Sequence, residues 1–149
     1  MKALSTDLCN NILARGKKEK IPITPVKLQK LMYYTCREYV RLSGSMPIDE
    51  NFEAWPYGPV LRSVYNEFCC YHGDPIRSYS KDARGNSYQA DESKDPILRQ
   101  ALDKVWSDMK DIPGFYLSQM THRPGSAWSI ARASGRKIIY IDDIRCDNT

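Results

Sequence analysis

The stretch that most constrains the fold runs from Thr24 to Phe68, where a rigid corner separates two amphipathic segments. The corner is Trp55 followed by Pro-Tyr-Gly-Pro, in which Pro56 and Pro59 fix their own backbone φ angles. The glycine between them tolerates backbone angles that other residues avoid. A regular helix does not continue through such a segment, so we expect a corner of fixed shape between two helices.

The segment before this corner predicts a long helix from Pro25 to about Ser43. Apolar side chains recur there at every third or fourth position, as on a helix that packs along one face. Thr24 is a favourable N-cap, Pro25 suits the first helical position, and Gly44 suits the end.

Further helices and two extended segments follow from similar signals. Ser5 or Thr6 is expected to cap the first helix, Gly16 to end it, Asp95 to cap the fourth and Ser126 the last. The predicted helices span about 6–14, 25–43, 59–71, 96–109, 115–120 and 126–131. Residues 52–55 favour a short extended segment, and the β-branched run at 137–144 favours a strand.

Length and composition indicate a single globular domain over residues 1–149. The chain is 42% hydrophobic and 27% charged, close to soluble averages. A domain of this length buries about two thirds of the surface that its unfolded chain exposes. We therefore expect a mainly α fold with minor β, a compact helical bundle with short extended segments. Residues 76–94 are polar around Arg84-Gly85-Asn86, so both a small exposed hairpin and a mobile loop remain open.

Cysteine usage and hydropathy indicate a soluble cytoplasmic protein. The five cysteines form no CxxC pair, and the chain begins without an apolar signal segment. No window approaches the ~20 apolar residues of a membrane-spanning helix, so no membrane contact is expected. With two histidines and no phosphate-binding glycine motif, neither a metal site nor a cofactor is expected.

The net charge of +4 leaves nucleic-acid binding as one alternative. The densest basic run includes Lys17, Lys18 and Lys20, at the end of the first predicted helix. Such a run is usually solvated surface, and dedicated nucleic-acid binders show larger basic patches with interleaved aromatics. We therefore expect no nucleic-acid partner.

An enzymatic alternative finds little support in the sequence. Cys69, Cys70, His72 and His122 supply thiols and bases, but their spacing does not indicate that a nucleophile and a base lie together. Free cysteine usually behaves as a small buried apolar residue. The prediction is a protein without catalytic activity.

Three motifs give the chain a family resemblance. They are ITPVKLQKLMYY at 23–34, EAWPYGPV at 53–60, and LSQMTH at 117–122 followed by Trp128. In this order over about residues 4–144, they resemble the Panacea domain, also called the SocA-like domain, of bacterial and phage toxin–antitoxin systems. The chain departs from the family after the Thr-His pair, where an acidic residue is absent and Ala127 precedes the tryptophan.

The resemblance implies a mostly helical, non-catalytic module that neutralises a toxin by protein–protein contact. Occlusion of the toxin and its delivery to a protease both remain open. A second hypothesis is a phage or mobile-element inhibitor of another host or defence protein. A third is a nucleic-acid-binding regulator that uses the lysines near residue 18.

Candidate binding residues lie in or beside the motifs. Tyr57 and Arg62 are expected to be exposed, whereas Trp55 and Trp128 are expected to have structural roles. Adjacent Tyr33 and Tyr34 point to different sides of a helix, so one is expected in the core and the other at a groove or surface. The candidate partner-binding residues are Gln29, Tyr33, Tyr34, Tyr57, Gly58, Pro59, Arg62 and His122.

Overall fold

Helices dominate residues 2–149, the part of the chain that the computed structural model describes. The predicted mainly α class with minor β is confirmed. The elements are α1 (Ser5–Glu19), α2 (Pro25–Ser43), β1 (Glu53–Trp55), β2 (Gly58–Val60), α3 (Arg62–Phe68), the 3₁₀ turn η1 (Cys69–Tyr71), α4 (Pro96–Met109), α5 (Gly114–Thr121), α6 (Ala127–Ala133) and α7 (Ile141–Arg145).

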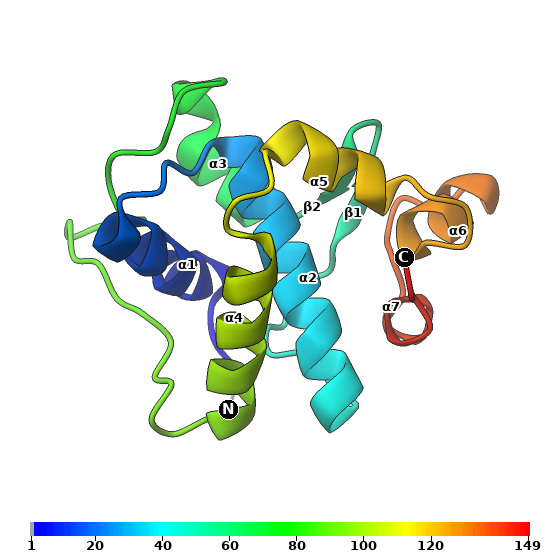
Figure 1. Ribbon diagram of the computed structural model, residues 1–149, viewed down its shortest axis with the longest axis horizontal. Coiled ribbons are helices and arrows are strands. Elements are labelled where there is room, and N and C mark those ends of the chain that lie inside the picture. The colour runs from blue at the N-terminus through cyan, green and yellow to red at the C-terminus, as the bar shows by residue number, and fades with distance from the viewer. Residues whose placement is uncertain (1) are drawn as a thin grey trace.

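The central element is α2, which is flanked by α1 and α4 on one side and by α7 on the other (Figure 1). The Thr24 hydroxyl accepts a hydrogen bond from the Lys27 N–H at 3.3 Å, and Gly44 ends the helix with a φ of 80°. The predicted bounds of this helix are confirmed. Every α-helix contributes buried apolar residues to one core cluster, which is built around α2.

The predicted caps of α4 and α6 are also confirmed. The Asp95 carboxylate accepts from the Leu98 N–H at 3.1 Å, and the Ser126 hydroxyl accepts from the Ser129 N–H at 3.1 Å. Each cap satisfies one of the free N–H groups in the first turn of its helix. The starting positions of α4 and α6 are therefore determined by their own capping residues.

The predicted end of the first helix is wrong, because α1 continues through Gly16 to Glu19. A Cβ at Gly16 would lie 2.7 Å from the Ile23 side chain, so this glycine permits a close approach between two segments. The helix ends instead at Lys20, whose φ is 59°. No side chain caps its start, because Leu4 occupies the N-cap position where Ser5 or Thr6 was expected.

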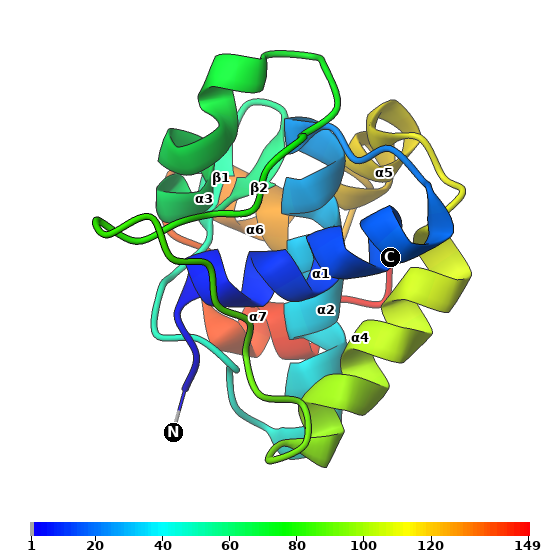
Figure 2. The same ribbon diagram turned by 90° about the vertical axis from the view of Figure 1, so that its left-hand side faces the viewer.

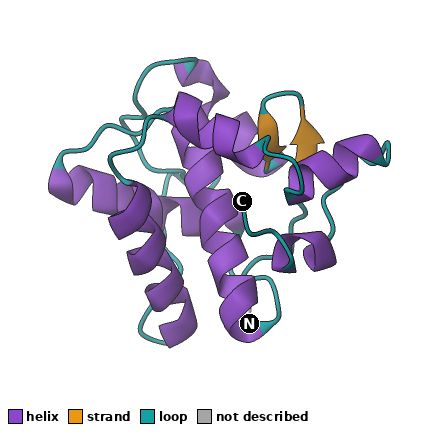
Figure 3. Ribbon diagram, turned by 45° about the vertical axis from the view of Figure 1, so that its right-hand side comes forward, coloured by secondary structure: helices purple, strands orange, loops and turns teal. Residues whose placement is uncertain are grey.

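The expected helix at Pro59 is wrong, because Pro59 belongs to strand β2. The strands β1 and β2 form an antiparallel pair (Figure 3). In this pair Trp55 faces Gly58, Ala54 faces Pro59, and Glu53 faces Val60. Pro59 has no N–H to donate, but its fixed φ is compatible with an extended strand as well as with a first helical turn. Helix α3 begins three residues later, at Arg62.

The strand predicted over 137–144 is largely wrong. Residues 137–139 do run beside β1, where the Ala54 N–H donates to the Lys137 carbonyl at 2.7 Å and the Ile139 N–H donates to the Phe52 carbonyl at 2.9 Å. Only an isolated bridge between Glu53 and Ile138 forms there. The chain then turns into α7, whose acidic first turn suits a helix start.

The 76–94 segment is a loop that crosses the outer face of α1, and it contains no strand (Figure 2). Two asparagines of α1 hold it through their amide groups. Asn10 donates to the Ser80 and Tyr88 carbonyls at 3.0 and 2.8 Å, and Asn11 exchanges bonds of 2.9 and 2.8 Å with Ala90. The hairpin alternative is therefore wrong, and the loop is anchored on both sides of its tip.

Candidate protein-binding surface

The β1–β2 hairpin forms a narrow corner that only a glycine at position 58 allows. Residues Pro56 and Tyr57 make the two-residue connection, and Gly58 follows with a φ of 120°. A Cβ at this position would lie 2.8 Å from the Thr121 hydroxyl and 2.9 Å from the Lys30 ammonium. Both the backbone angle and the lack of space therefore require glycine.

Side chains of helix α2 form hydrogen bonds with the backbone at the second strand of the hairpin and just after it. The Gln29 side-chain amide donates to the Leu61 carbonyl at 3.0 Å and accepts from the Leu61 N–H at 2.9 Å. The next residue, Lys30, donates to the Pro59 carbonyl at 3.0 Å. Adjacent polar side chains of one helix thus satisfy the backbone at and just after β2.

Helices α5 and α6 hold the first strand and the tip. Four consecutive carbonyls, from residue 54 to residue 57, each accept a hydrogen bond from a different side chain. The donors are Arg132 to Ala54 at 3.1 Å, Trp128 to Trp55 at 2.6 Å, His122 to Pro56 at 2.9 Å, and Ser118 to Tyr57 at 2.6 Å. The three sequence motifs therefore meet at this hairpin and fix its position.

His122 bridges the hairpin and its own helix. Its Nε2 lies 2.9 Å from the Pro56 carbonyl oxygen and its Nδ1 lies 2.6 Å from the Ser118 carbonyl oxygen. A neutral imidazole donates through only one nitrogen, whereas the imidazolium donates through both. The ring also packs against Trp128, with centroids 4.0 Å apart, and so closes the second predicted corner onto the first.

Lys30 is a fully buried cation beneath the hairpin. Within residues 2–149 it forms no ion pair, and its ammonium lies 5.8 Å from the centre of the Tyr57 ring. Burial lowers its pKa to about 7, because the charged form loses its hydration. Near neutral pH, Lys30 is therefore expected to populate both its charged and its neutral form in the folded protein.

The outward face of the hairpin carries exposed aromatic side chains beside an arginine. We call Tyr57, Arg62, Tyr65 and Phe115 the hairpin surface; Tyr57 is 42% exposed and Phe115 is 67% exposed. Half-buried Trp55 packs against three of them, with its ring centroid 5.9 Å from that of Tyr57, 4.8 Å from that of Tyr65 and 5.2 Å from the Arg62 guanidinium. These contacts assemble residues of the hairpin and α3 into one ridge.

An ion pair fixes the arginine on this ridge. Glu53 accepts hydrogen bonds from Arg62 and from the Trp55 indole, each at 2.9 Å. The hydrogen bond from Arg62 is the main cause that lowers the pKa of Glu53 and raises that of Arg62. The guanidinium is therefore oriented at the surface before any partner arrives.

Two hollows flank Tyr57. One, of about 220 Å³, lies between the start of α2, the hairpin and α3, and is lined mainly by apolar side chains such as Val64 and Phe68. The other, of about 560 Å³, is a shallower depression between the hairpin tip and α5, bordered by Phe115 and Arg123. Tyr57 forms a wall of both, so it is the central residue of the hairpin surface.

The structure divides the predicted binding residues into exposed and buried groups. Tyr57 and Arg62 are exposed, as expected, and His122 is half-buried. The other five are buried: Gln29, Tyr33, Tyr34, Gly58 and Pro59. Trp55 and Trp128, which were expected to have structural roles, are half-buried, and each joins the hydrogen-bond network of the hairpin.

The expectation that one of the two adjacent tyrosines lines a groove or surface is wrong, because both are 1% exposed. Helix α2 is covered on several sides, so different faces of it are buried at once. Tyr33 donates to the Asp147 carboxylate at 2.6 Å, and Tyr34 packs against Arg37, whose guanidinium is 4.6 Å from the ring centre. Burial raises the pKa of both phenols, that of Tyr34 to about 12.

Several side chains of this region were not predicted from the sequence to bind or anchor, among them Lys30, Tyr65, Phe115, Ser118 and Arg132. Tyr65 lies on α3 directly after the buried Val64 and is 38% exposed. An available signal for Phe115 was the adjacent pair Phe115-Tyr116 on a short helix, because two neighbouring aromatics rarely share one buried face. Nothing local identifies Lys30, since lysine is almost never fully buried.

Two of the five cysteines are buried, and the described residues contain no group of potential metal ligands. Among residues 2–149 no three acidic, histidine or cysteine side chains converge as metal ligands, and no helix there has the length and apolar character to cross a membrane. Burial raises the pKa of the Cys9 and Cys36 thiols, which disfavours the nucleophilic thiolate. All five cysteines are free.

Comparisons with known proteins agree with the arrangement of the motifs. The family model described as "Antitoxin SocA-like, Panacea domain" matches residues 28–129, which include the hairpin and most of its anchoring side chains. The chain is 26% identical over 126 residues to a protein named Antitoxin SocA from Caulobacter vibrioides (strain NA1000 / CB15N), covering 83% of this chain and 67% of that protein. No solved structure matches the chain. The chain belongs to the SocA-like Panacea domain family.

Proposed function

We propose that this protein is a non-catalytic antitoxin that neutralises a toxin protein by direct contact through the hairpin surface. Family membership supports an antitoxin-like role, and the similar Caulobacter protein is itself named an antitoxin. The observation that carries the proposal is the exposed aromatic ridge on a hairpin that five side chains hold by its backbone carbonyls, with a sixth, Gln29, bonded to the next residue, Leu61.

The residue types on this ridge suit a protein partner. Tyrosine and arginine are enriched where binding energy is concentrated, because they combine large contact area with hydrogen-bonding groups. Tyr57 stands between two hollows that would accept side chains of the partner. Because the hairpin is already fixed, binding loses little conformational entropy, which favours affinity.

The first test looks for a toxin-sized reading frame beside this gene in its native genome and co-expresses its product with the chain. We expect the chain to restore growth in cells that express that toxin, and the two proteins to co-purify. Toxin half-life distinguishes occlusion, in which the toxin persists, from delivery to a protease, in which it disappears. Growth rescue without a physical complex would contradict the proposal.

The second test changes the hairpin surface itself. Tyr57→Ala combined with Arg62→Glu removes the central aromatic and reverses the neighbouring charge, so we expect co-purification and growth rescue to be lost. Both side chains are exposed, so the thermal unfolding midpoint should change little. The matched control is Tyr88→Ala, which removes a tyrosine that is 54% exposed on the 76–94 loop. Unchanged rescue by the double variant would exclude the hairpin surface as the toxin-binding site.

A further inference from the structure

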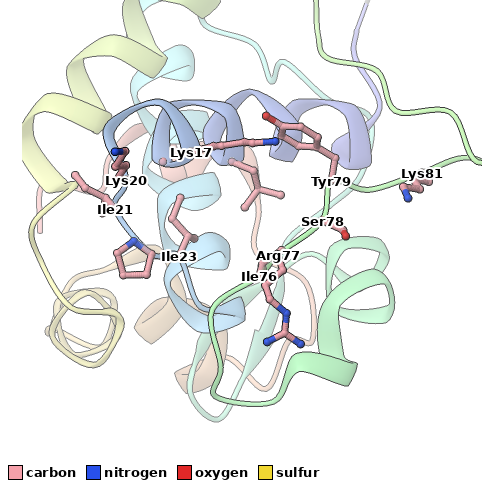
Figure 4. A pocket seen from close by; sticks show the side chains of 12 residues that line it. Lys17, Lys20, Ile21, Ile23, Ile76, Arg77, Ser78, Tyr79 and Lys81 are labelled. Atoms are coloured by element: carbon pink, nitrogen blue, oxygen red, sulfur yellow. The ribbon is translucent and has the colours of Figure 1, made fainter.

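A separate groove of about 570 Å³ lies at the C-terminal end of α1, away from the hairpin surface (Figure 4). We call it the α1 groove. Its walls are α1, the connection to α2 and the first residues of the 76–94 loop, and it shares no lining residue with either hollow beside Tyr57. Its floor is aliphatic and includes Leu13, Ile21, Ile23 and Ile76.

The groove is formed before any ligand binds, because its walls are tied together. The Ile76 N–H donates to the Ile23 carbonyl at 2.8 Å, which joins the loop to the segment before α2. Asn10 fixes Ser80 at the other end of the same loop segment. The absent side chain at Gly16 gives Ile23 its place in the floor.

The rim of the α1 groove is basic and unneutralised. Its cations are Lys17, Lys20, Arg77 and Lys81, all of them exposed, and among residues 2–149 none forms an ion pair. The Lys17 ammonium lies 5.5 Å from the centre of the Tyr79 ring, and Figure 4 shows this side chain reaching across from α1 to the loop.

Carboxylates in the neighbouring segments have other partners. That of Asp82 accepts from the backbone N–H groups of Arg84 and Asn86, each at 2.9 Å. Glu19 pairs with Lys110 at 2.8 Å, on the side of α1 that faces α4. Glu67 accepts from the backbone N–H of Lys81 at 3.2 Å. An excess of positive charge therefore surrounds an apolar floor, and this combination selects a ligand that carries both carboxylates and aliphatic groups.

We propose that the α1 groove binds an acidic, leucine- or isoleucine-containing segment of a partner protein. The aliphatic side chains of that segment would cover the floor, and its carboxylates would meet the four cations of the rim. A nucleic acid would satisfy the cations but not the floor, because single-stranded binding relies on open aromatic faces for base stacking. Tyr79 is the aromatic residue of the lining, and Lys17 lies over its ring.

Fluorescence anisotropy with the full chain tests this proposal. The probe is a labelled peptide of alternating glutamate and leucine, compared with one of glutamate and serine, one of lysine and leucine, and a single-stranded DNA of equal charge. We expect the glutamate–leucine peptide to bind most tightly and its affinity to fall as salt rises. Equal binding of the serine peptide, tighter binding of the DNA, or no binding of the glutamate–leucine peptide would each overturn the proposal.

Charge reversal at the rim locates the site. Lys20→Glu with Lys81→Glu changes two exposed lysines that make neither an ion pair nor an aromatic contact among the described residues, and should weaken the glutamate–leucine peptide by about tenfold or more. Lys94→Glu with Lys104→Glu alters the net charge equally at exposed positions outside the groove lining, where each lysine has only a solvent-exposed ion pair, and should leave affinity within about twofold. Equal loss in both variants would overturn the proposal, because the attraction would then be nonspecific. Neither pair touches the hairpin surface, so toxin rescue reports separately on the proposed function.

Discussion

The roles of several single residues in this protein depend on contacts with residues that are far away in the sequence. Gly58 is required by the Thr121 hydroxyl and the Lys30 side chain, which come from two different helices. Lys30 can be buried because the Pro59 carbonyl accepts a hydrogen bond from its side chain and the hairpin covers it. The sequence predicts a turn at Gly58 from local chemistry, but the burial of Lys30 depends on tertiary packing.

Gly58→Ala should destabilise the protein by about 2 to 4 kcal/mol, because it combines backbone strain with a steric clash. The matched control is Gly85→Ala, where φ is 83° but no atom lies within 4 Å of the added Cβ. The control should lose only the strain, about 1 kcal/mol. Urea unfolding of the two variants measures the difference, and equal losses would show that crowding at Gly58 is unimportant.

The unfolding free energy should rise with pH just above neutrality because of Lys30. Its pKa is lowered to about 7 in the folded protein, against ~10.4 in the unfolded chain. Between these values the unfolded chain binds the extra proton, so stability increases with pH by at most about 1.4 kcal/mol per unit. Below pH 7 both states are protonated and this contribution to the slope disappears.

Urea titrations between pH 7 and about 8, below the range in which the unfolded thiols ionise, measure this slope, and Lys30→Met should remove the contribution of Lys30. At higher pH the slope reverses in part, because burial raises the pKa of the Cys9 and Cys36 thiols and the folded state then retains protons that the unfolded chain loses. An identical slope in wild type and Lys30→Met would show that Lys30 does not titrate in this range.

At the scale of elements, the sequence is most informative where a helix carries its own caps. Helix α2 has the predicted bounds because Thr24, Pro25 and Gly44 act locally. Strand β2 and helix α7 were mispredicted because their conformations depend on partners elsewhere. Pro59 suits a helix start as well as an extended strand, and the side chains of α2 decide between them. The same local reasoning placed Tyr57 and Arg62 at the surface, whereas the hydrogen bonds that fix the hairpin could not be predicted from it.

The 76–94 loop should loosen when its anchor on α1 changes. Asn10 donates two hydrogen bonds to loop carbonyls, so Asn10→Asp places a carboxylate against two carbonyl oxygens and loses both bonds. We expect faster amide hydrogen exchange in residues 76–94 and faster trypsin cleavage at Arg84, with little change in α2. Asn66→Asp, on the exposed side of α3, is the matched control and should behave as wild type. Unaltered exchange in the loop would mean that Asn10 does not hold it.

At the scale of the whole molecule, one buried carboxylate connects the C-terminal segment to the centre of the fold. Asp147 accepts from the Tyr33 hydroxyl of α2 at 2.6 Å and from the N–H of Ala127 at the start of α6 at 3.2 Å. Burial opposes its charge, but hydrogen bonds from Thr149 and Tyr33 outweigh this effect and lower its pKa. Two buried polar side chains that are 114 positions apart, Tyr33 and Asp147, thus satisfy each other's hydrogen bonding.

Asp147→Ala should cost about 2 to 4 kcal/mol of unfolding free energy, because it leaves the buried Tyr33 hydroxyl without an acceptor. Asp147→Ala combined with Tyr33→Phe removes both members of that bond, so the double variant should recover part of the loss. A double-mutant cycle by urea unfolding measures the coupling between the two side chains. Purely additive losses would show that the hydrogen bond contributes little.

The way in which the hairpin is anchored has a consequence for how its recognition could diversify. The side chains that anchor the hairpin form hydrogen bonds with main-chain carbonyl oxygens, which every amino acid possesses. Replacing Tyr57 by another residue therefore leaves the attachment intact while altering what an incoming protein meets. Such a scaffold lets specificity drift through its outer side chains without the domain having to fold in a new way.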